Sequence, residues 1–177
     1  MFVKPYDMKA TGTFLLITLF LLTGACNGDD DDAQPAPTDS SDILFTDPVN
    51  SGGCVDFQFY HYSDERRYGL LLSGNSDSLN LTTDWQNFAL NERSLSLTLY
   101  EFSQPVTNYF CDDVLEANEE PVQEQEAEEG TVRLRIVQSP NEVGIYTLDV
   151  LMQDVRVGGL QIDQLERNDV EVGWTPG

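Results

Sequence analysis

The chain contains a single histidine, His61, which limits the catalytic arrangements that the sequence offers. His61 lies between Tyr60 and Tyr62 in an alternating run, where an imidazole is more often a packed, hydrogen-bonded side chain than a general base. No serine stands in the Gly-x-Ser-x-Gly pattern that presents a nucleophile, and no glycine-rich phosphate loop is present. With one histidine, and with two of the three cysteines expected to form a disulfide, no set of Cys and His ligands is left for zinc. We therefore expect no enzymatic activity and no cofactor.

The 31 Asp and Glu residues are the other groups able to do chemistry. Two carboxylates hydrolyse glycosidic bonds in many enzymes, so a carboxylate-dependent glycan hydrolase is kept as an alternative. In so acidic a chain such pairs arise by chance and carry little diagnostic weight. Acidic loops also bind calcium, but the Asp-x-Asp-x-Asp-Gly pattern is absent, so a structural calcium site is an alternative that we do not favour.

Three aromatic residues, Tyr60, Tyr62 and Trp85, are candidates for ligand contact. Exposed aromatic rings stack on sugars or pack against a partner protein. Tyr60 and Tyr62 share a strand face with Asp56 and Gln58, and polar neighbours indicate an outward face. The alternative is packing in the core or at the sheet edges. The ligand expected for such a surface is a glycan or a protein.

The N-terminus has the features of an export signal. Lys4 and Lys9 give it a positive start, and residues 10–25 then carry no charge, with an apolar centre at residues 14–22. This run is shorter than the roughly 20 residues that a membrane-spanning helix needs. It ends in Thr23, Gly24 and Ala25, the small residues of a cleavage site. Residues 1–25 are therefore predicted to be a signal peptide.

The junction that follows resembles bacterial lipoprotein precursors. In that family small residues directly precede the acylated cysteine, as Leu22-Thr23-Gly24-Ala25 precede Cys26 here. The next residues, Asn-Gly and four Asp at 27–32, resemble the acidic stretch of surface lipoproteins of the Bacteroidota. The family usually has Leu where this chain has Thr23, so ordinary cleavage after Ala25 stays an alternative.

The resemblance covers about the first 32 residues. It implies that Cys26 carries the lipid and that the mature protein is anchored in the outer membrane, facing the medium, with a periplasmic orientation as the alternative. Three cysteines are present, and an odd number outside the cytoplasm needs an explanation. Lipidation of Cys26 leaves Cys54 and Cys111 as a pair, and an oxidising compartment permits their disulfide.

The formal net charge of the chain is −22. Both lysines lie within residues 1–25, so every cation of the mature chain is an arginine. Such a charge keeps a protein soluble but destabilises its compact state through self-repulsion. Because phosphate backbones and anionic lipid surfaces are bound through Lys and Arg, we expect no nucleic-acid partner. The composition also suits a salt-rich environment, where the repulsion is screened.

Residues 26–43 are predicted to be an acidic flexible tether, because they hold almost nothing to bury. Residues 44–177 are predicted to form one domain. From about residue 52 the pattern has period two, most clearly at residues 94–100, where Leu alternates with Ser and Thr. Eight or nine such runs indicate an all-β fold, a single antiparallel β-sandwich with a small β-barrel as the alternative.

One short turn and one long loop are expected in the second half of the chain. Gln153 and Asp154 are predicted to form a short hairpin turn between two strands. Residues 112–130 are rich in Glu and Gln and poor in apolar side chains, which predicts a disordered acidic loop.

The function that the sequence as a whole favours is a lipid-anchored, non-catalytic binding or interaction module of the cell envelope. A structural component of an envelope assembly is the second alternative beside the hydrolase.

Overall fold

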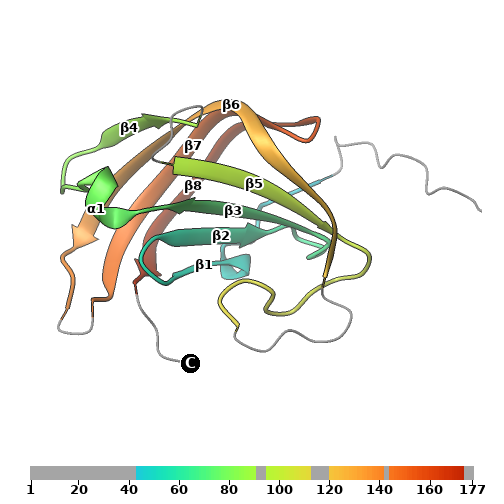
Figure 1. The fold of residues 1–177 in the computed structure, drawn as a ribbon, viewed down its shortest axis with the longest axis horizontal. Helices are drawn as coiled ribbons and strands as arrows, with labels where there is room; N and C mark the ends of the chain where they lie inside the picture. Colours follow the sequence, from blue (N-terminus) through green and yellow to red (C-terminus); the bar gives the residue numbers. More distant parts are fainter. Residues whose placement is uncertain (1–42, 91–94, 113–119, 142–143, 174–177) are drawn as a thin grey trace, which may run out of the picture. The chain divides into compact units, whose positions relative to one another are not determined.

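The computed structural model describes residues 43–90, 95–112, 120–141 and 144–173. These residues form a single antiparallel sheet with two short helices (Figure 1). Along the chain, the 3-10 helix η2 (Pro48–Asn50) precedes β1 (Ser51–Cys54), β2 (Gln58–Tyr62) and β3 (Tyr68–Gly74). The helical turn α1 (Ser76–Leu79) follows, and then come β4 (Gln86–Ala89), β5 (Leu95–Phe102), β6 (Pro121–Gln138), β7 (Tyr146–Val157) and β8 (Leu160–Val172).

The strands are ordered β1-β2-β3-β5-β6-β7-β8 in the sheet, with β4 paired to β6 beside this path. Every strand pairing is antiparallel. An isolated bridge between Val55 and Gly173 brings the end of β1 beside the end of β8. The sheet is thus nearly closed and barrel-like. The prediction of an all-β antiparallel fold is confirmed, and the arrangement corresponds to the barrel alternative rather than to two separate sheets.

The length of β6 explains why one sheet forms in place of two. Its first half pairs with β5, from Thr98 against Glu126 to Phe102 against Pro121. Its second half pairs with β4, from Gln86 against Leu134 to Ala89 against Thr131. Bulges in the β6–β7 pairing lie between these halves, and bulges bend a strand and increase its twist. The single bent strand β6 therefore joins the two halves of the sheet, which in a β-sandwich would be connected by a loop.

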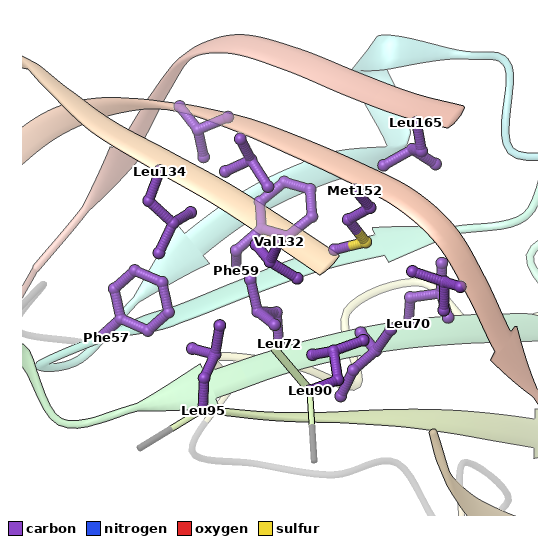
Figure 2. Close-up of a cluster of buried hydrophobic side chains, with 14 of the residues drawn as sticks. Phe57, Phe59, Leu70, Leu72, Leu90, Leu95, Val132, Leu134, Met152 and Leu165 are labelled. Carbon is purple, nitrogen blue, oxygen red and sulfur yellow. The ribbon is translucent and has the colours of Figure 1, made fainter. Parts of the chain in front are cut away.

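The core lies inside the curved sheet and follows from the alternation of the strands. Leu95, Leu97 and Leu99 of β5 are buried, whereas Ser96 between them is exposed. Figure 2 shows Phe57, Phe59, Leu70 and Leu72 on one side of this core, facing Val132, Leu134, Met152 and Leu165 on the other. Burying such side chains contributes about 1.5–3 kcal/mol each, which makes this core the main stabilising feature of the domain.

The acidic loop predicted at residues 112–130 is wrong for its second half. Residues 121–130 belong to β6 and pair with β5 and β7. Their Glu side chains are exposed, so no charge is buried when the segment becomes a strand. The neighbouring strands supply the hydrogen bonds that the sequence of this segment does not reveal. Residues 113–119 lie outside the described residues.

The hairpin turn predicted at Gln153 and Asp154 is also wrong. Strand β7 continues through both residues to Val157, and the chain reverses at Gly158 and Gly159. Asp154 takes a left-handed conformation, with φ of 52°, inside the strand. A local irregularity in a long strand thus has the same sequence signal as a turn.

Candidate ligand-binding site

The predicted disulfide between Cys54 and Cys111 is confirmed, with the two Cα atoms 5.8 Å apart. It ties the end of β1 to the segment at residues 103–111, which we call the covering segment. Arg66 holds the same segment from the other side: its Nε donates to the carbonyl of Val106 at 2.7 Å, and it also bonds the carbonyl of Thr107. Arg67 also donates to the carbonyl of Ser103 at 3.2 Å, so the disulfide and two arginines hold the covering segment on the outer face of the sheet.

The covering segment buries one of the predicted contact residues. Tyr60 and Tyr62 point to the outer face as expected, but Tyr62 is only 2% exposed. Its ring stacks on Phe110, with the centroids 5.1 Å apart, and its hydroxyl accepts the backbone N–H of Phe110. Burial raises the pKa of Tyr62 to about 12. Tyr62 is thus part of a second, smaller core under the covering segment and presents no free ring face.

Trp85 lies elsewhere, just before β4, and is partly exposed. The guanidinium carbons of Arg133 and Arg135 lie 5.2 and 4.7 Å from its ring centroid. Arg135 in turn pairs with Asp149, whose side chain is 4% exposed, at 2.6 Å. Trp85 therefore stacks on the protein's own arginines. The structure does not bring Tyr60, Tyr62 and Trp85 together into one aromatic platform.

His61 is fully buried at the end of β2. Its Nδ1 lies 2.8 Å from the carbonyl oxygen of Tyr62, so this nitrogen carries the proton. Its Nε2 accepts from Arg167, whose guanidinium also donates to the carbonyl of Phe45. Burial and the nearby charge of Arg167 lower the pKa of His61 to about 4. The histidine is a neutral packing residue that holds the start of the domain against β8.

The opposite end of the sheet holds a pocket of about 560 Å³, which we call the mouth pocket. Its lining residues come from the β1–β2 turn, α1, the ends of β6 and β8 and the start of β7. Its walls combine apolar and polar groups: Leu81, Ile136, Pro140, Tyr146, Asp56, Ser76, Asp77, Asn80, Gly144 and Gly173. This size and mixture are typical of small-molecule sites, which often lie in the mouths of barrels.

The polar side of the mouth pocket is built by α1. The carboxylate of Asp56 accepts the backbone N–H and the hydroxyl of Ser76, which fixes α1 to the β1–β2 turn. Asn75 caps the same helical turn by accepting the N–H of Ser78. Asp77, the residue after Ser76, is exposed. The pocket therefore has one carboxylate committed to the fold and one directed to solvent.

Tyr146 forms part of the pocket floor. Its hydroxyl donates to the carbonyl of Asp56 at 3.1 Å. Burial, with a smaller effect of the Asp56 charge, raises the pKa of Tyr146 to about 12, so the phenol is neutral. No basic side chain lines the pocket among the described residues. The polar groups it offers a ligand are the exposed carboxylate of Asp77 and the hydroxyl and amide groups of Ser76 and Asn80, beside an apolar wall.

Sequence reasoning missed this pocket. Asn75-Ser76-Asp77 is a helix-start signal, and it was available in the sequence. Nothing local, however, indicates that this turn packs near Tyr146, which is some seventy residues away along the chain. The site is assembled only when the two halves of the sheet meet.

Two other expectations concern metals and membranes. In the described part of the chain, no three His, Cys, Asp or Glu residues are grouped so as to hold a metal ion. The helices seen there include none long and apolar enough to cross a membrane. Cys26, the predicted signal peptide and nearly all of the predicted tether lie outside the described residues.

Comparison with protein-family models, curated proteins and solved structures finds no match to this chain. The function must therefore be argued from the groups that line the surface of the domain.

Proposed function

We propose that the protein is a lipid-anchored binding module of the cell envelope. Three sequence features support this: the charge-free segment at residues 10–25, the small residues before Cys26, and the four aspartates that follow. The Cys54–Cys111 disulfide fits an oxidising compartment outside the cytoplasm. The orientation we propose is toward the medium, from the outer membrane, and the periplasmic orientation is its alternative.

The mouth pocket is the observation that carries the binding role. It offers carboxylate, amide and hydroxyl groups on one side and Leu81, Ile136 and Pro140 on the other. Such a lining suits a small ligand rich in hydrogen-bond donors with an apolar face, which describes both saccharides and organic amines. The net charge of −22 adds a long-range attraction for the amines.

Binding to the full-length protein tests this function. Calorimetric titrations would use a neutral saccharide, the matching amino sugar and a phenylalkylamine, with phenylbutyrate as an anionic control. We expect binding of at least one donor-rich probe and none of phenylbutyrate. Failure of every donor-rich probe, or equal binding of phenylbutyrate, would contradict the proposal.

A pair of variants locates the site. Asp77→Asn removes the solvent-facing carboxylate of the pocket, and Asp163→Asn removes the same charge from an exposed position on β8. We expect Asp77→Asn to weaken binding of an amine probe about tenfold or more, since a charge-assisted hydrogen bond is lost, and Asp163→Asn to leave it unchanged. Equal effects of the two variants would place the binding outside the mouth pocket.

The anchoring half of the proposal has its own experiment. Metabolic lipid labelling of the wild type and of Cys26→Ala, combined with protease treatment of intact cells, separates the outcomes. We expect label on the wild type alone and removal of the domain by the protease. A labelled but protected domain would support the periplasmic orientation and a role in envelope assembly, and an unlabelled wild type would exclude the lipid anchor.

The hydrolase alternative has less support from the pocket. Asp56 uses both carboxylate oxygens to hold Ser76, which is the role of a structural carboxylate. A glycan that binds in the mouth pocket and is recovered intact after prolonged incubation would favour the binding module. Release of shorter products, lost in Asp77→Asn, would favour the hydrolase.

A further inference from the structure

Arg133 in β6 differs from the other arginines of this protein in its bonding. Each of the others that the structure describes is bonded to an acceptor of the protein itself, and these are Arg66, Arg67, Arg135, Arg156 and Arg167. The side chain of Arg133 makes no hydrogen bond or ion pair with the described residues. In a chain with 31 Asp and Glu residues, a guanidinium without a carboxylate is unexpected.

The Arg133 side chain is also enclosed in part. Its Nε is buried without a hydrogen-bond acceptor, and no other buried side-chain nitrogen or oxygen of the described residues lacks a partner. Leaving a buried donor of a charged group unpaired is costly, so such a group calls for an explanation. Arg133 as a whole is partly exposed, and its terminal nitrogens are not enclosed in the same way. A ligand from solvent can therefore reach them.

The surroundings of Arg133 are neutral and polar. On the outer face of the sheet, where β4 lies along the second half of β6 (Figure 1), Arg133 is opposite Asn87 on one side and Leu151 on the other. Thr131, two residues earlier in β6, shares this face and is opposite Gln153. We call Asn87, Thr131, Arg133 and Gln153, together with Trp85, the arginine face. Its hydroxyl and amide groups surround one cation.

Trp85 and Arg135 hold the guanidinium of Arg133 without neutralising it. The ring centroid of Trp85 lies 5.2 Å from the guanidinium carbon of Arg133, and such a contact uses the flat face of the cation. The N–H groups at the edge of the guanidinium stay available. Arg135, on the same ring, is paired with Asp149 at 2.6 Å, and Asp149 also accepts the N–H of Asp169. That carboxylate is therefore committed to the fold.

We propose that the arginine face binds an acidic saccharide, with the oxyanion group of the sugar on Arg133. The planar guanidinium forms paired hydrogen bonds with a carboxylate or a sulfate, and these charge-assisted bonds are stronger than neutral ones. The sugar hydroxyls lie against Asn87, Thr131 and Gln153, whose amides and hydroxyl both donate and accept. This site is separate from the mouth pocket.

The charge of the protein restricts the ligand further. The arginine face has one unpaired guanidinium, which matches one oxyanion group at the point of contact. Glu166 is opposite Leu151 on β8 and is the next acidic residue across the sheet from Arg133. A ligand with charges packed as closely as in a nucleic acid would meet this carboxylate and the field of a chain with net charge −22. Oxyanions spaced by a sugar ring avoid both.

The fluorescence of Trp85 in the full-length protein reports the site. Titrations at 150 mM NaCl would use glucuronate and glucose 6-sulfate as probes, with glucose and phenylbutyrate as controls. Trp85→Phe, which keeps Trp174, identifies the signal of Trp85. We expect a saturable change with at least one acidic sugar, and the two probes distinguish a carboxylate from a sulfate as the preferred group. Glucose lacks the oxyanion and phenylbutyrate the hydroxyls, so both should leave the signal unchanged. An equal response to either control, or none to the acidic sugars, would overturn the proposal.

Two matched variants test the role of Arg133. Arg133→Gln removes the unpaired charge, and Arg156→Gln removes the same charge from a half-exposed ion pair on β7. We expect Arg133→Gln to weaken binding of the acidic sugar at least tenfold, because the charge-assisted bonds are lost, and Arg156→Gln to leave it unchanged. Equal losses would show that the probe responds only to the overall charge of the protein.

A third variant keeps Arg133 in place. Asn87→Asp puts a carboxylate opposite the guanidinium at an exposed position, where it forms the cross-strand pair that the wild type lacks. We expect loss of acidic-sugar binding with no decrease in the thermal midpoint, so the loss is not due to unfolding. A folded Asn87→Asp protein that binds the acidic sugar as tightly as the wild type would contradict the assignment of Arg133.

This inference is independent of the mouth pocket. Asp77→Asn, which alters the pocket, should leave the response of Trp85 to the acidic sugar unchanged. Failure of either site is therefore recognised separately from failure of the other.

Discussion

His61 shows what a single residue contributes to this fold. It is buried and neutral, with Nδ1 donating to the carbonyl of Tyr62 and Nε2 accepting from Arg167. The Arg167 guanidinium carries only donors, and it also donates to the carbonyl of Phe45. An imidazole that gained a proton would face this guanidinium with two donors opposed. The role of His61 in this fold is therefore that of a neutral hydrogen-bond acceptor for Arg167.

The first prediction concerns pH. The folded-state pKa of His61 is about 4, below its ordinary value of 6.5. Between these two pH values the histidine is protonated in the unfolded chain and neutral in the folded chain. The stability from this residue is complete above pH 6.5 and decreases as the pH falls toward 4. At pH 5 the loss is about 2 kcal/mol. Urea unfolding at pH 7.5 and pH 5 measures it.

The control for this measurement is His61→Gln, whose amide oxygen still accepts from Arg167 but does not titrate. Protonation of the many carboxylates also changes stability over this range, and it does so in both proteins. The wild type should therefore lose more stability than the variant between the two pH values. A parallel pH dependence of the two would contradict the role assigned to His61.

At the scale of the element, short segments are held by distant partners. The covering segment has little regular structure, yet it buries Phe110 against Tyr62 because Cys111 and Arg66 fasten it. Strand β6 is similar: its acidic half is a strand because β5 lies alongside. In both cases the element follows from its neighbours more than from its own residues.

Removal of the disulfide is the second prediction. The bond closes a loop with a sequence separation of 57, which is worth about 4 kcal/mol in the chain-entropy model. Cys54→Ser/Cys111→Ser should lower the free energy of unfolding by that order. The amide of Phe110, which donates to Tyr62, should also lose its protection against hydrogen exchange. Unchanged protection at Phe110 would mean that the hydrogen bonds of Arg66 and Arg67 hold the covering segment without the disulfide.

The third prediction concerns the β7–β8 hairpin. Gly158 and Gly159 have φ of 57° and 78°, the positive values that a two-residue hairpin turn uses. Gly159→Asn should be neutral or stabilising by up to about 0.5 kcal/mol, because a Cβ at this position meets no atom within 4 Å and Asn tolerates the conformation and restricts the unfolded chain. Gly159→Val should destabilise by about 1–2 kcal/mol, since a β-branched residue is strained there. Thermal unfolding of the two variants gives the comparison, and equal stabilities would contradict this description of the turn.

At the scale of the whole molecule, the dominant property is charge. A net charge of −22 acts on every part of the sheet, and few of the acidic side chains are paired in the described residues. Arg156 with Glu128 and Glu129 is such a pairing, and its members are about half exposed, so its contribution is small. Self-repulsion is therefore opposed mainly by the core and by the disulfide.

The fourth prediction follows from this balance. The urea midpoint should rise between 50 mM and 1 M NaCl, because the Debye length falls from more than 10 Å to about 3 Å and screens the repulsion. Glu124→Gln/Glu126→Gln removes two exposed charges from β6 and should reduce the salt dependence. A midpoint that does not respond to salt would show that the repulsion is unimportant and would remove the argument for a salt-rich environment.

Local information was sufficient for several features of this protein. The alternation of Leu with Ser and Thr at residues 94–100 predicts a half-buried strand, because side chains of a strand alternate between two faces. The pairing of Cys54 with Cys111 followed from counting cysteines once Cys26 was assigned to the lipid. The alternation likewise predicts that Tyr60 and Tyr62 lie on the face of β2 opposite to the buried Phe59, but it does not predict that Tyr62 is buried there by the covering segment. These features depend on spacing along the chain, and spacing is fully contained in the sequence.

The tertiary structure decided everything that depends on pairing between distant segments. Closure of the sheet depends on β6 serving both β4 and β5, and the strand at residues 121–130 depends on the hydrogen bonds of β5 and β7. The burial of Tyr62 depends on the covering segment, and the mouth pocket on the meeting of α1 with β7. The physical reason is the same in each case. The groups that complete the backbone hydrogen bonds of a strand and bury its side chains lie far along the chain, and the residues of the strand do not specify which segment will pair with it.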